Sequence, residues 1–367
     1  MKFSKRQRFL SYVRCETKQS IVSPFLPDPD VIKNTLAFLG LESVDDFIKN
    51  EIRLSEELDY EPMFMTEFSS LIFPWKEEKE KSDECYKFCT IKTSHGEWQH
   101  KFPKDDIPWS DTADCPINSE KDHEKIVLIC EHINERETEI RNYFRNFRDR
   151  VGENGVIVAG HPHPSWLGYQ ISPQAIYYQW NDFPEIFKKS MNALFEAAKF
   201  VMSIAIEEGI DFMSDSSYGL EMTSPKLFCE MDLPYIQGFS KFTHEHESLF
   251  WYHNCGFTKG LIQDGSFNSM GADVIETIAP PPEGDNDLAE SRQFIDQKIC
   301  TKGNLNLNLL RNGTPDEIRS ATEKIVATVA GWKHILSTAD AVLPGTPPEN
   351  FIAFVKTARA LSNNILN

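Results

Sequence analysis

A His-x-Cys pair is the feature of this sequence with the clearest chemical potential. His253 and Cys255 lie two residues apart, so on an extended backbone their side chains point to the same side. An imidazole nitrogen and a thiolate sulfur are ligands that zinc prefers, and zinc needs at least one further protein ligand. Asp340, Glu221 and Cys300 are the candidates for it. The alternative interpretation is a hydrogen-bonded active-site histidine beside a buried thiol, because such short motifs often mislead.

A second group of reactive side chains lies in a proline-rich stretch. Prolines on both sides of His163 stiffen the backbone, so Trp166 is held at a defined angle. We interpret His163 and Trp166, together with Tyr218, as walls of a pocket for an aromatic substrate. His161 is a candidate for protonating a leaving group. A rigid turn that carries solvated imidazoles is the competing interpretation.

Carboxylates and an amide complete the set of candidates. Asp215 and Glu276 each follow an apolar run, where they can polarise a substrate or orient a histidine. Such groups often pair with a lysine instead, and Lys302 is the obvious structural partner. Asn304 is expected to help to orient the substrate. We assign Asp215, His161 and Glu276 to catalysis.

The elements that must position these residues alternate regularly after residue 124. Apolar runs of strand length are separated by longer segments with helical periodicity, which predicts parallel β-α-β units. The predicted strands are 155–160, 211–215, 249–253, 273–276, 298–303 and 334–337, preceded by one at 21–25. One more strand would close an α/β (β/α)8 TIM barrel, in which the carboxyl ends of the strands carry the active site. An open doubly wound sheet is the alternative, but no strand is followed by a GxGxxG loop.

The first third of the chain is less regular. Between about residues 60 and 125, charged runs alternate with aromatic, strand-like pieces. We therefore expect a single barrel over 1–367 that has an inserted or capping segment at 60–125.

The overall charge excludes several classes of partner. A formal net charge of −18 repels nucleic-acid backbones and anionic membranes. No apolar stretch approaches the roughly 18 residues of a membrane span, and the basic N-terminus lacks the apolar core of a signal peptide. We expect a cytoplasmic protein whose eight cysteines are free thiols or metal ligands, and leave a homodimer open.

The C-terminal third resembles the uroporphyrinogen decarboxylase superfamily. The resemblance rests on blocks that occur in the family's order, and together with 252–256 it covers roughly residues 150–365. These blocks are Gly303-Asn304-Leu305, Arg311-Asn312-Gly313-Thr314-Pro315-Asp316-Glu317-Ile318, His334-Ile335-Leu336-Ser337-Thr338 and Leu343-Pro344-Gly345-Thr346-Pro347-Pro348-Glu349-Asn350. Decarboxylases of the family carry an arginine-rich motif for the substrate's carboxylates. The corresponding stretch here, 20–29, contains no arginine.

The resemblance therefore implies the corrinoid-dependent methyltransferase branch. In that branch a His-x-Cys and a later cysteine bind zinc, and a methyl group passes to or from the cobalt of a corrinoid on a separate protein. His253 and Cys255 match the first two ligands, whereas Asp340 stands at the third. A carboxylate suits polarisation of oxygen better than activation of a thiol. We expect demethylation of a small methoxylated, aromatic donor. A methylcorrinoid:thiol methyltransferase, a metal-independent lyase and a non-catalytic binding barrel are the alternatives.

Overall fold

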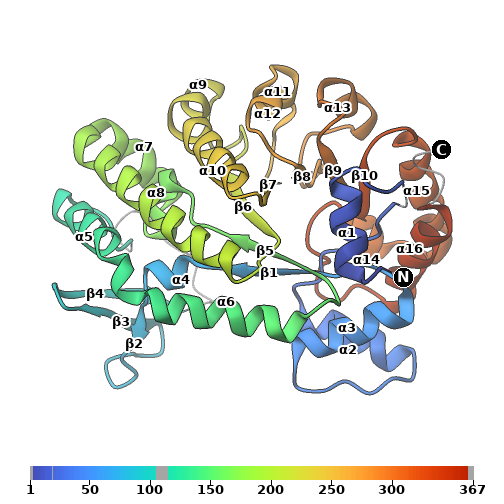
Figure 1. Cartoon of the computed structure of the whole chain (residues 1–367), viewed down its shortest axis with the longest axis horizontal. Helices are drawn as coiled ribbons and strands as arrows, with labels where there is room; N and C mark the ends of the chain where they lie inside the picture. Colours follow the sequence, from blue (N-terminus) through green and yellow to red (C-terminus); the bar gives the residue numbers. More distant parts are fainter. Residues whose placement is uncertain (1–2, 19, 105–114, 363–367) are drawn as a thin grey trace.

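A curled parallel sheet forms the centre of the computed structural model, which describes residues 3–18, 20–104 and 115–362. Within these residues seven strands pair in the order β1-β5-β6-β7-β8-β9-β10, and helices surround the sheet (Figure 1). The strands are β1 (Met63–Glu67), β5 (Val156–Gly160), β6 (Phe212–Ser217), β7 (Leu249–Asn254), β8 (Val274–Glu276), β9 (Cys300–Leu305) and β10 (His334–Thr338).

A short extended segment around Val22 joins the two edges of this sheet. Leu336 N donates to Ile21 O and Ser23 N donates to Leu336 O, both at 2.9 Å, and on the other side Glu61 N donates to Val22 O at 2.9 Å. The segment thus lies between β10 and β1 and takes the eighth position. The α/β barrel predicted from the sequence is confirmed, and the open sheet is excluded.

The helices largely follow the predicted alternation. Thr314 caps α15 in a reciprocal box with Glu317, as its sequence indicates. The helical segment between β6 and β7 is divided into three consecutive elements, because Pro234 cannot donate the helical hydrogen bond and a π-helical turn precedes it. The helical elements are α1 (Lys5–Val13), α2 (Pro29–Phe38), α3 (Phe47–Leu58), α4 (Ser69–Ile72), α5 (Glu120–Glu131), η2 (Ile133–Arg136), α6 (Glu137–Val151), η3 (Pro164–Tyr169), α7 (Pro173–Asp182), α8 (Pro184–Glu207), α9 (Pro225–Leu227), η4 (Phe228–Asp232), α10 (Leu233–Glu245), α11 (Lys259–Gln263), α12 (Ser266–Ser269), α13 (Leu288–Phe294), α14 (Leu307–Asn312), α15 (Pro315–Thr328) and α16 (Pro348–Leu361).

Side-chain alternation along the strands separates the lumen from the outer core. Val156, Phe212 and Trp251 belong to one buried cluster inside the barrel, whereas their neighbours in the strands pack outward against the helices. Phe9 of α1 joins the inner cluster, with its ring 5.9 Å from that of Phe212, so α1 covers the amino-terminal end of the barrel. Two residues further along β7, the lumen position is polar: it is His253. The polar layer therefore lies towards the carboxyl ends of the strands.

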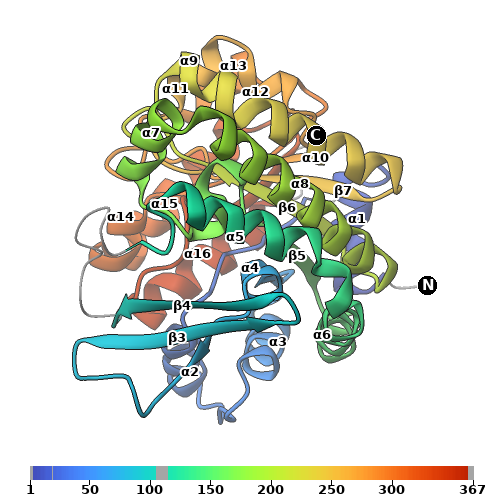
Figure 2. The ribbon, with the colours of Figure 1, turned by 90° about the vertical axis from the view of Figure 1, so that its left-hand side faces the viewer.

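A small antiparallel sheet lies beside the barrel. It consists of β2 (Lys76–Glu77), β3 (Tyr86–Thr93) and β4 (Gly96–Pro103) and lies near α4 and α5 (Figure 2). It falls within the range 60–125, although β1 of the same range belongs to the large sheet and residues 105–114 lie outside the described residues.

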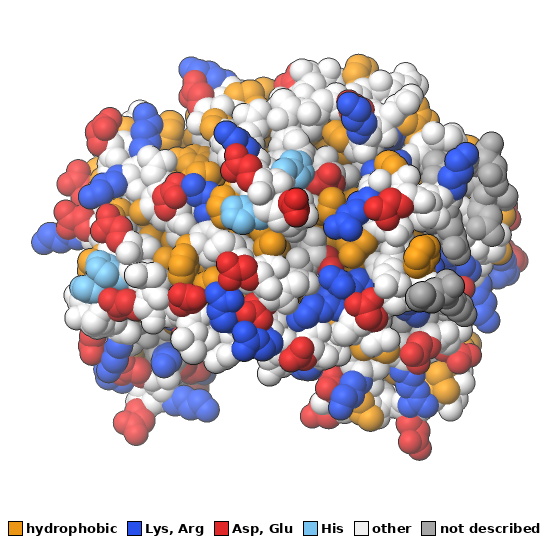
Figure 3. Space-filling model, viewed as in Figure 1, with side chains coloured by type: hydrophobic (Ala, Val, Ile, Leu, Met, Phe, Trp, Pro, Cys, Tyr) orange, Lys and Arg blue, Asp and Glu red, His pale blue; other side chains and the backbone are white. Residues whose placement is uncertain are grey.

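The surface charge and the length of the helices are relevant to binding of nucleic acids and membranes. Acidic and basic side chains are interspersed on the face shown in Figure 3, despite the net charge of −18. In the described part of the chain, no helix combines the length and apolar character that crossing a bilayer requires.

The closure of the barrel gives a first prediction. The buried Glu61 carboxylate accepts hydrogen bonds from Val22 N at 3.3 Å, from Arg8 at 2.9 Å and from Arg359 at 2.6 Å. Glu61→Ala should lower the free energy of unfolding by about 3–5 kcal/mol, because it leaves two guanidinium groups without their shared carboxylate. Urea unfolding measures this. Glu153→Gln, at an exposed ion pair, should cost less than about 1 kcal/mol, and equal losses in both variants would contradict the role of Glu61.

Candidate active site

A buried network of charges lies where β7, β8 and β9 end. Glu276 Oε2 accepts a hydrogen bond from Trp251 Nε1 at 3.0 Å, and Lys302 Nζ bonds Glu276 Oε1. The Lys302 side chain is fully buried, so this pair is screened from water. Burial alone would raise the pKa of Glu276, but Lys302 and then His253 lower it to about 2. The carboxylate is therefore ionised at neutral pH and orients its neighbours rather than donating a proton.

His253 is held between two carboxylates. Its Nδ1 lies 3.4 Å from Glu276 Oε2, and its Nε2 lies 4.0 Å from Asp340 Oδ2. Burial alone would lower the pKa of His253, but Cys255 and Glu276 raise it well above its usual value. Nδ1 therefore faces Glu276, and Nε2 faces Asp340. This carboxylate–histidine arrangement is typical of histidines that bind metals.

The donor atoms around His253 suit zinc in type and partly in spacing. Two ligands with bonds of about 2.0–2.2 Å to one ion can lie at most about 4.3 Å apart, and His253 Nε2 and Asp340 Oδ2 fall within this limit. Cys255 lies close enough to His253 to raise the pKa of that histidine. The donor atoms of His253, Cys255 and Asp340, all three of them described residues, do not all lie within 4.8 Å of one another. Asp340 is 39% exposed, so its side chain has room to rotate.

The other two proposed zinc ligands lie in different surroundings. Glu221 Oε2 accepts from the backbone N–H of Phe257 at 2.7 Å and packs against Gly256, where a Cβ would lie 1.8 Å from its other oxygen. Glu221 thus holds the loop that carries Cys255. Contrary to the prediction, Cys300 does not lie near the other proposed zinc ligands. It begins β9 and is buried in the inner cluster beside α1, at the opposite end of the lumen. It cannot contribute to a site at the barrel mouth.

A second cluster joins β6 to the loop after β5. His163 Nδ1 lies 2.9 Å from both oxygens of Asp215, and its Nε2 lies 2.9 Å from Asp232 Oδ1 without the alignment of a hydrogen bond. Burial alone would lower the pKa of His163, but the two carboxylates raise it to about 10. The His163 and Asp215 side chains have no exposed surface. An imidazolium therefore bridges two carboxylates here, which positions the loop that carries Trp166.

His161 lies in an apolar environment beside this cluster. Its side chain is fully buried, its ring centroid is 3.8 Å from that of Phe239, and its Nδ1 is 3.7 Å from Asp215 Oδ1. Neither ring nitrogen has a hydrogen-bond partner among the described residues. Burial lowers its pKa to about 4. A neutral, enclosed imidazole is poorly suited to the role of proton donor that the sequence suggested.

Aromatic side chains form a shelf near the barrel mouth. The rings of Trp166 and Tyr218 stack with centroids 4.3 Å apart at an angle of 29°, and Tyr169 lies 5.3 Å from Trp166. Tyr169 and Tyr218 line a cavity of about 290 Å³. Asn304, another predicted substrate contact, donates to Ile278 O at 3.0 Å and so fixes the loop after β8.

Glu67, at the end of β1, is a further candidate that the sequence reasoning missed. Its carboxylate packs against Gly160, where a Cβ would lie 2.3 Å from Oε1. The side chain keeps contact with solvent at the open mouth, yet the enclosing walls remove enough water to raise its pKa to about 7. The apolar run 63–65 followed by a strand-end carboxylate was the available signal, but the segment was assigned to an insertion.

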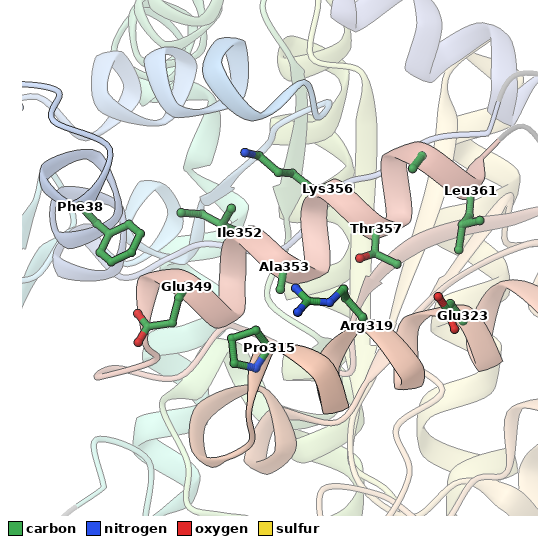
Figure 4. A pocket seen from close by; sticks show the side chains of 11 residues that line it. Phe38, Pro315, Arg319, Glu323, Glu349, Ile352, Ala353, Lys356, Thr357 and Leu361 are labelled. Carbon is green, nitrogen blue, oxygen red and sulfur yellow. The ribbon is translucent and has the colours of Figure 1, made fainter.

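Another hollow lies away from this site. A groove of about 490 Å³ is lined by residues of α15 and α16, among them Arg319, which lies between the two helices (Figure 4). None of the barrel-mouth residues lines it. We therefore place the candidate active site at the carboxyl ends of the strands and not in this groove.

Comparisons with known proteins agree with the fold. The model of the family described as "Uroporphyrinogen decarboxylase (URO-D)" matches residues 170–361. Uroporphyrinogen decarboxylases of Prochlorococcus marinus (strain NATL2A) and Trichodesmium erythraeum (strain IMS101) are 26% and 27% identical over 185 and 184 residues. These matches cover 50% and 49% of both chains, so this chain spans about half the length of the curated relatives it matches.

Among solved structures, a methyltransferase from Methanosarcina mazei is similar over almost the whole chain. The match covers 97% of this chain and 98% of that one, with a TM-score of 0.63 and 15% sequence identity. At this identity the likeness shows a shared fold and no more.

The buried imidazolium predicts a pH-dependent stability. His163 has a higher pKa in the folded chain, about 10, than its ordinary value of 6.5, so its contribution is complete below about pH 6.5 and is lost as the pH rises through about 10. The difference in unfolding free energy between the parent and His163→Gln should therefore shrink from about pH 6 to about pH 9.5. Urea unfolding across this range measures it. His246→Gln, at an exposed histidine, should leave the pH profile unchanged, and a pH-independent effect of His163→Gln would refute the assignment.

Proposed function

Because the chain belongs to the uroporphyrinogen decarboxylase family, we propose that it is a methyltransferase built on that family's barrel. It moves a methyl group from a small methoxylated, aromatic donor to the cobalt of a corrinoid carried by a partner protein. The observation that carries the proposal is the set of donors at the barrel mouth: His253 is oriented by Glu276 and faces Asp340, with Cys255 beside it.

The nature of these donors supports a zinc ion that acts on oxygen. His253, Cys255 and Asp340 would hold it, since nitrogen, sulfur and carboxylate oxygen are all zinc ligands. When bound, zinc supplies a Lewis acid that stabilises negative charge on the oxygen that loses its methyl group. Glu276, kept ionised by Lys302, fixes the ring orientation of His253. Glu221 fixes the loop of Cys255 through Phe257 N.

The chain's own residues provide binding and a proton. Tyr169 and Tyr218, which line the cavity and pack against the buried Trp166, offer aromatic rings on which a methoxybenzene can stack. In the proposed reaction the reduced cobalt of the partner's corrinoid would supply the electron pair of the new bond to the methyl carbon, and the pair of the broken carbon–oxygen bond would stay on the phenolic oxygen. Glu67, with a pKa of about 7, is partly protonated at neutral pH and is suited to deliver a proton to that oxygen.

A decarboxylase is the second candidate, and the names of the sequence relatives favour it. The charges described at the mouth oppose a substrate with many carboxylates. Glu67 and Asp340 are not neutralised by a lysine or arginine in any described ion pair, while Lys302 is already bound to Glu276. The mouth therefore favours a neutral or cationic donor over a polyanion.

The function is tested by single-turnover assays. Zinc-loaded protein, a reduced corrinoid protein and a panel of methoxybenzenes should yield methylcobalt, seen by its absorbance change, together with the corresponding phenol. His253→Ala and Cys255→Ser should reduce the rate by more than about 100-fold, since they remove ligands rather than supporting groups. His244→Ala, at a surface histidine, should not change it. Release of carbon dioxide from a carboxylated substrate without methyl transfer would replace the proposal by the decarboxylase.

A separate prediction concerns the orienting carboxylate. Glu276→Gln should weaken zinc binding at the barrel mouth by about 10–100-fold, because the His253 ring loses its charged carboxylate partner. The same change leaves Lys302 buried without a counter-charge, so the double variant Glu276→Gln, Lys302→Met serves as the folding control. Zinc titration measures affinity and circular dichroism measures folding. Native zinc affinity in a folded Glu276→Gln protein would contradict the positioning role.

A further inference from the structure

A second group of metal-binding side chains lies far from the strand ends of the barrel, on the small antiparallel sheet. His95 lies in the turn between β3 and β4, while His132 ends α5 and Glu135 follows in η2. The turn lies beside the end of α5 (Figure 2). One donor atom from each residue lies within 4.8 Å of the other two, the only such group among the described residues. From this arrangement we infer that His95, His132 and Glu135 form a zinc site.

Hydrogen bonds to neighbouring residues orient two of the three donor groups. His132 Nδ1 lies 2.9 Å from Leu128 O, and a carbonyl can only accept, so the ring proton is on Nδ1. This leaves the Nε2 lone pair of His132 available for a metal. The Glu135 carboxylate is fixed from the other side by Ser94 Oγ, which donates to Oε2 at 2.9 Å. One imidazole and the carboxylate are thus both oriented by neighbours outside the donor set.

The spacing is close to that of a tetrahedral ion. Donors with bonds of about 2.0–2.2 Å lie about 3.3–3.5 Å apart around tetrahedral zinc. His95 Nε2 and Glu135 Oε1 are 3.1 Å apart, and the two imidazole rings have centroids 3.6 Å apart. One ring nitrogen of His132 lies within 4.8 Å of the other two donor atoms. A bound ion would replace the direct contact between His95 and Glu135.

The choice of zinc follows from the ligands and their exposure. Two imidazoles and one carboxylate are borderline donors that suit zinc better than calcium or magnesium, which prefer oxygen. His95 and Glu135 are 35% and 47% exposed, so water can complete the fourth position. The ligands come from a hairpin on one side and a helix end on the other. Binding would therefore tie the small sheet to the helix layer.

The competing explanation is a surface histidine–carboxylate pair with a second histidine nearby. The pair of His244 with Asp273, at 2.9 Å, is such a case. It contains one imidazole and one carboxylate and does not gather a third donor. This pair is the matched control for the experiment.

The test separates this site from the one at the barrel mouth. In a His253→Ala, Cys255→Ser background, zinc titration and metal analysis of the full chain should still find about one zinc per chain. Adding His95→Ala and His132→Ala should abolish this binding, Ser94→Ala should weaken it by about 10-fold and His244→Ala should leave it unchanged. Zinc should also slow amide exchange in residues 86–103 of the background protein only when both histidines are present.

Two outcomes overturn the inference. Equal zinc binding with and without His95 and His132 would place the ion elsewhere, and absence of zinc binding in the background protein would leave only a hydrogen-bonded pair. Neither readout involves methyl transfer. The proposed function can therefore fail while this site stands, and the reverse also holds.

Discussion

The buried ion pair of Lys302 and Glu276 is the constraint on which the barrel mouth depends. Two charges without access to water are costly, and their attraction compensates only where further hydrogen bonds satisfy the remaining lone pairs. Trp251 Nε1 and His253 supply those contacts to Glu276 Oε2. Each partner is therefore fixed by the need to neutralise the others. The orientation of His253, which any metal site here requires, is a consequence of that need.

The architecture of the barrel explains why this network of charged side chains is open to solvent on one side only. Lumen positions at the strand starts are apolar and join Phe9 and Tyr12 of α1, so the amino-terminal end is covered and dry. Two residues further along the same strands, the lumen positions include His253, Glu276 and Lys302. Because side chains alternate with a period of two, one register places all these groups in one layer. A substrate can approach that layer only from the carboxyl ends of the strands.

Much of the barrel and part of the candidate site could be predicted from the sequence. The strands after residue 150 are buried on both faces and read as apolar runs. β1 was not recognised because it adjoins the irregular segment that forms the small sheet. Asp232 could not be foreseen as a partner of His163, since it lies in a π-turn and their contact exists only in three dimensions. Cys300, in contrast, could have been excluded from the sequence, because it lies near the start of the predicted strand 298–303 and therefore towards the amino-terminal end of the lumen.

Histidines in this chain divide into classes according to what surrounds them, and this division constrains the chemistry. His161 is enclosed by aromatic rings and is neutral, whereas His163 lies between two carboxylates and is charged. Both histidines are buried and have structural roles. His253 retains 18% of its side-chain surface, and its Nε2 faces the exposed carboxylate of Asp340. Access to solvent, rather than residue type, therefore marks His253 as the histidine of this barrel that can meet a ligand.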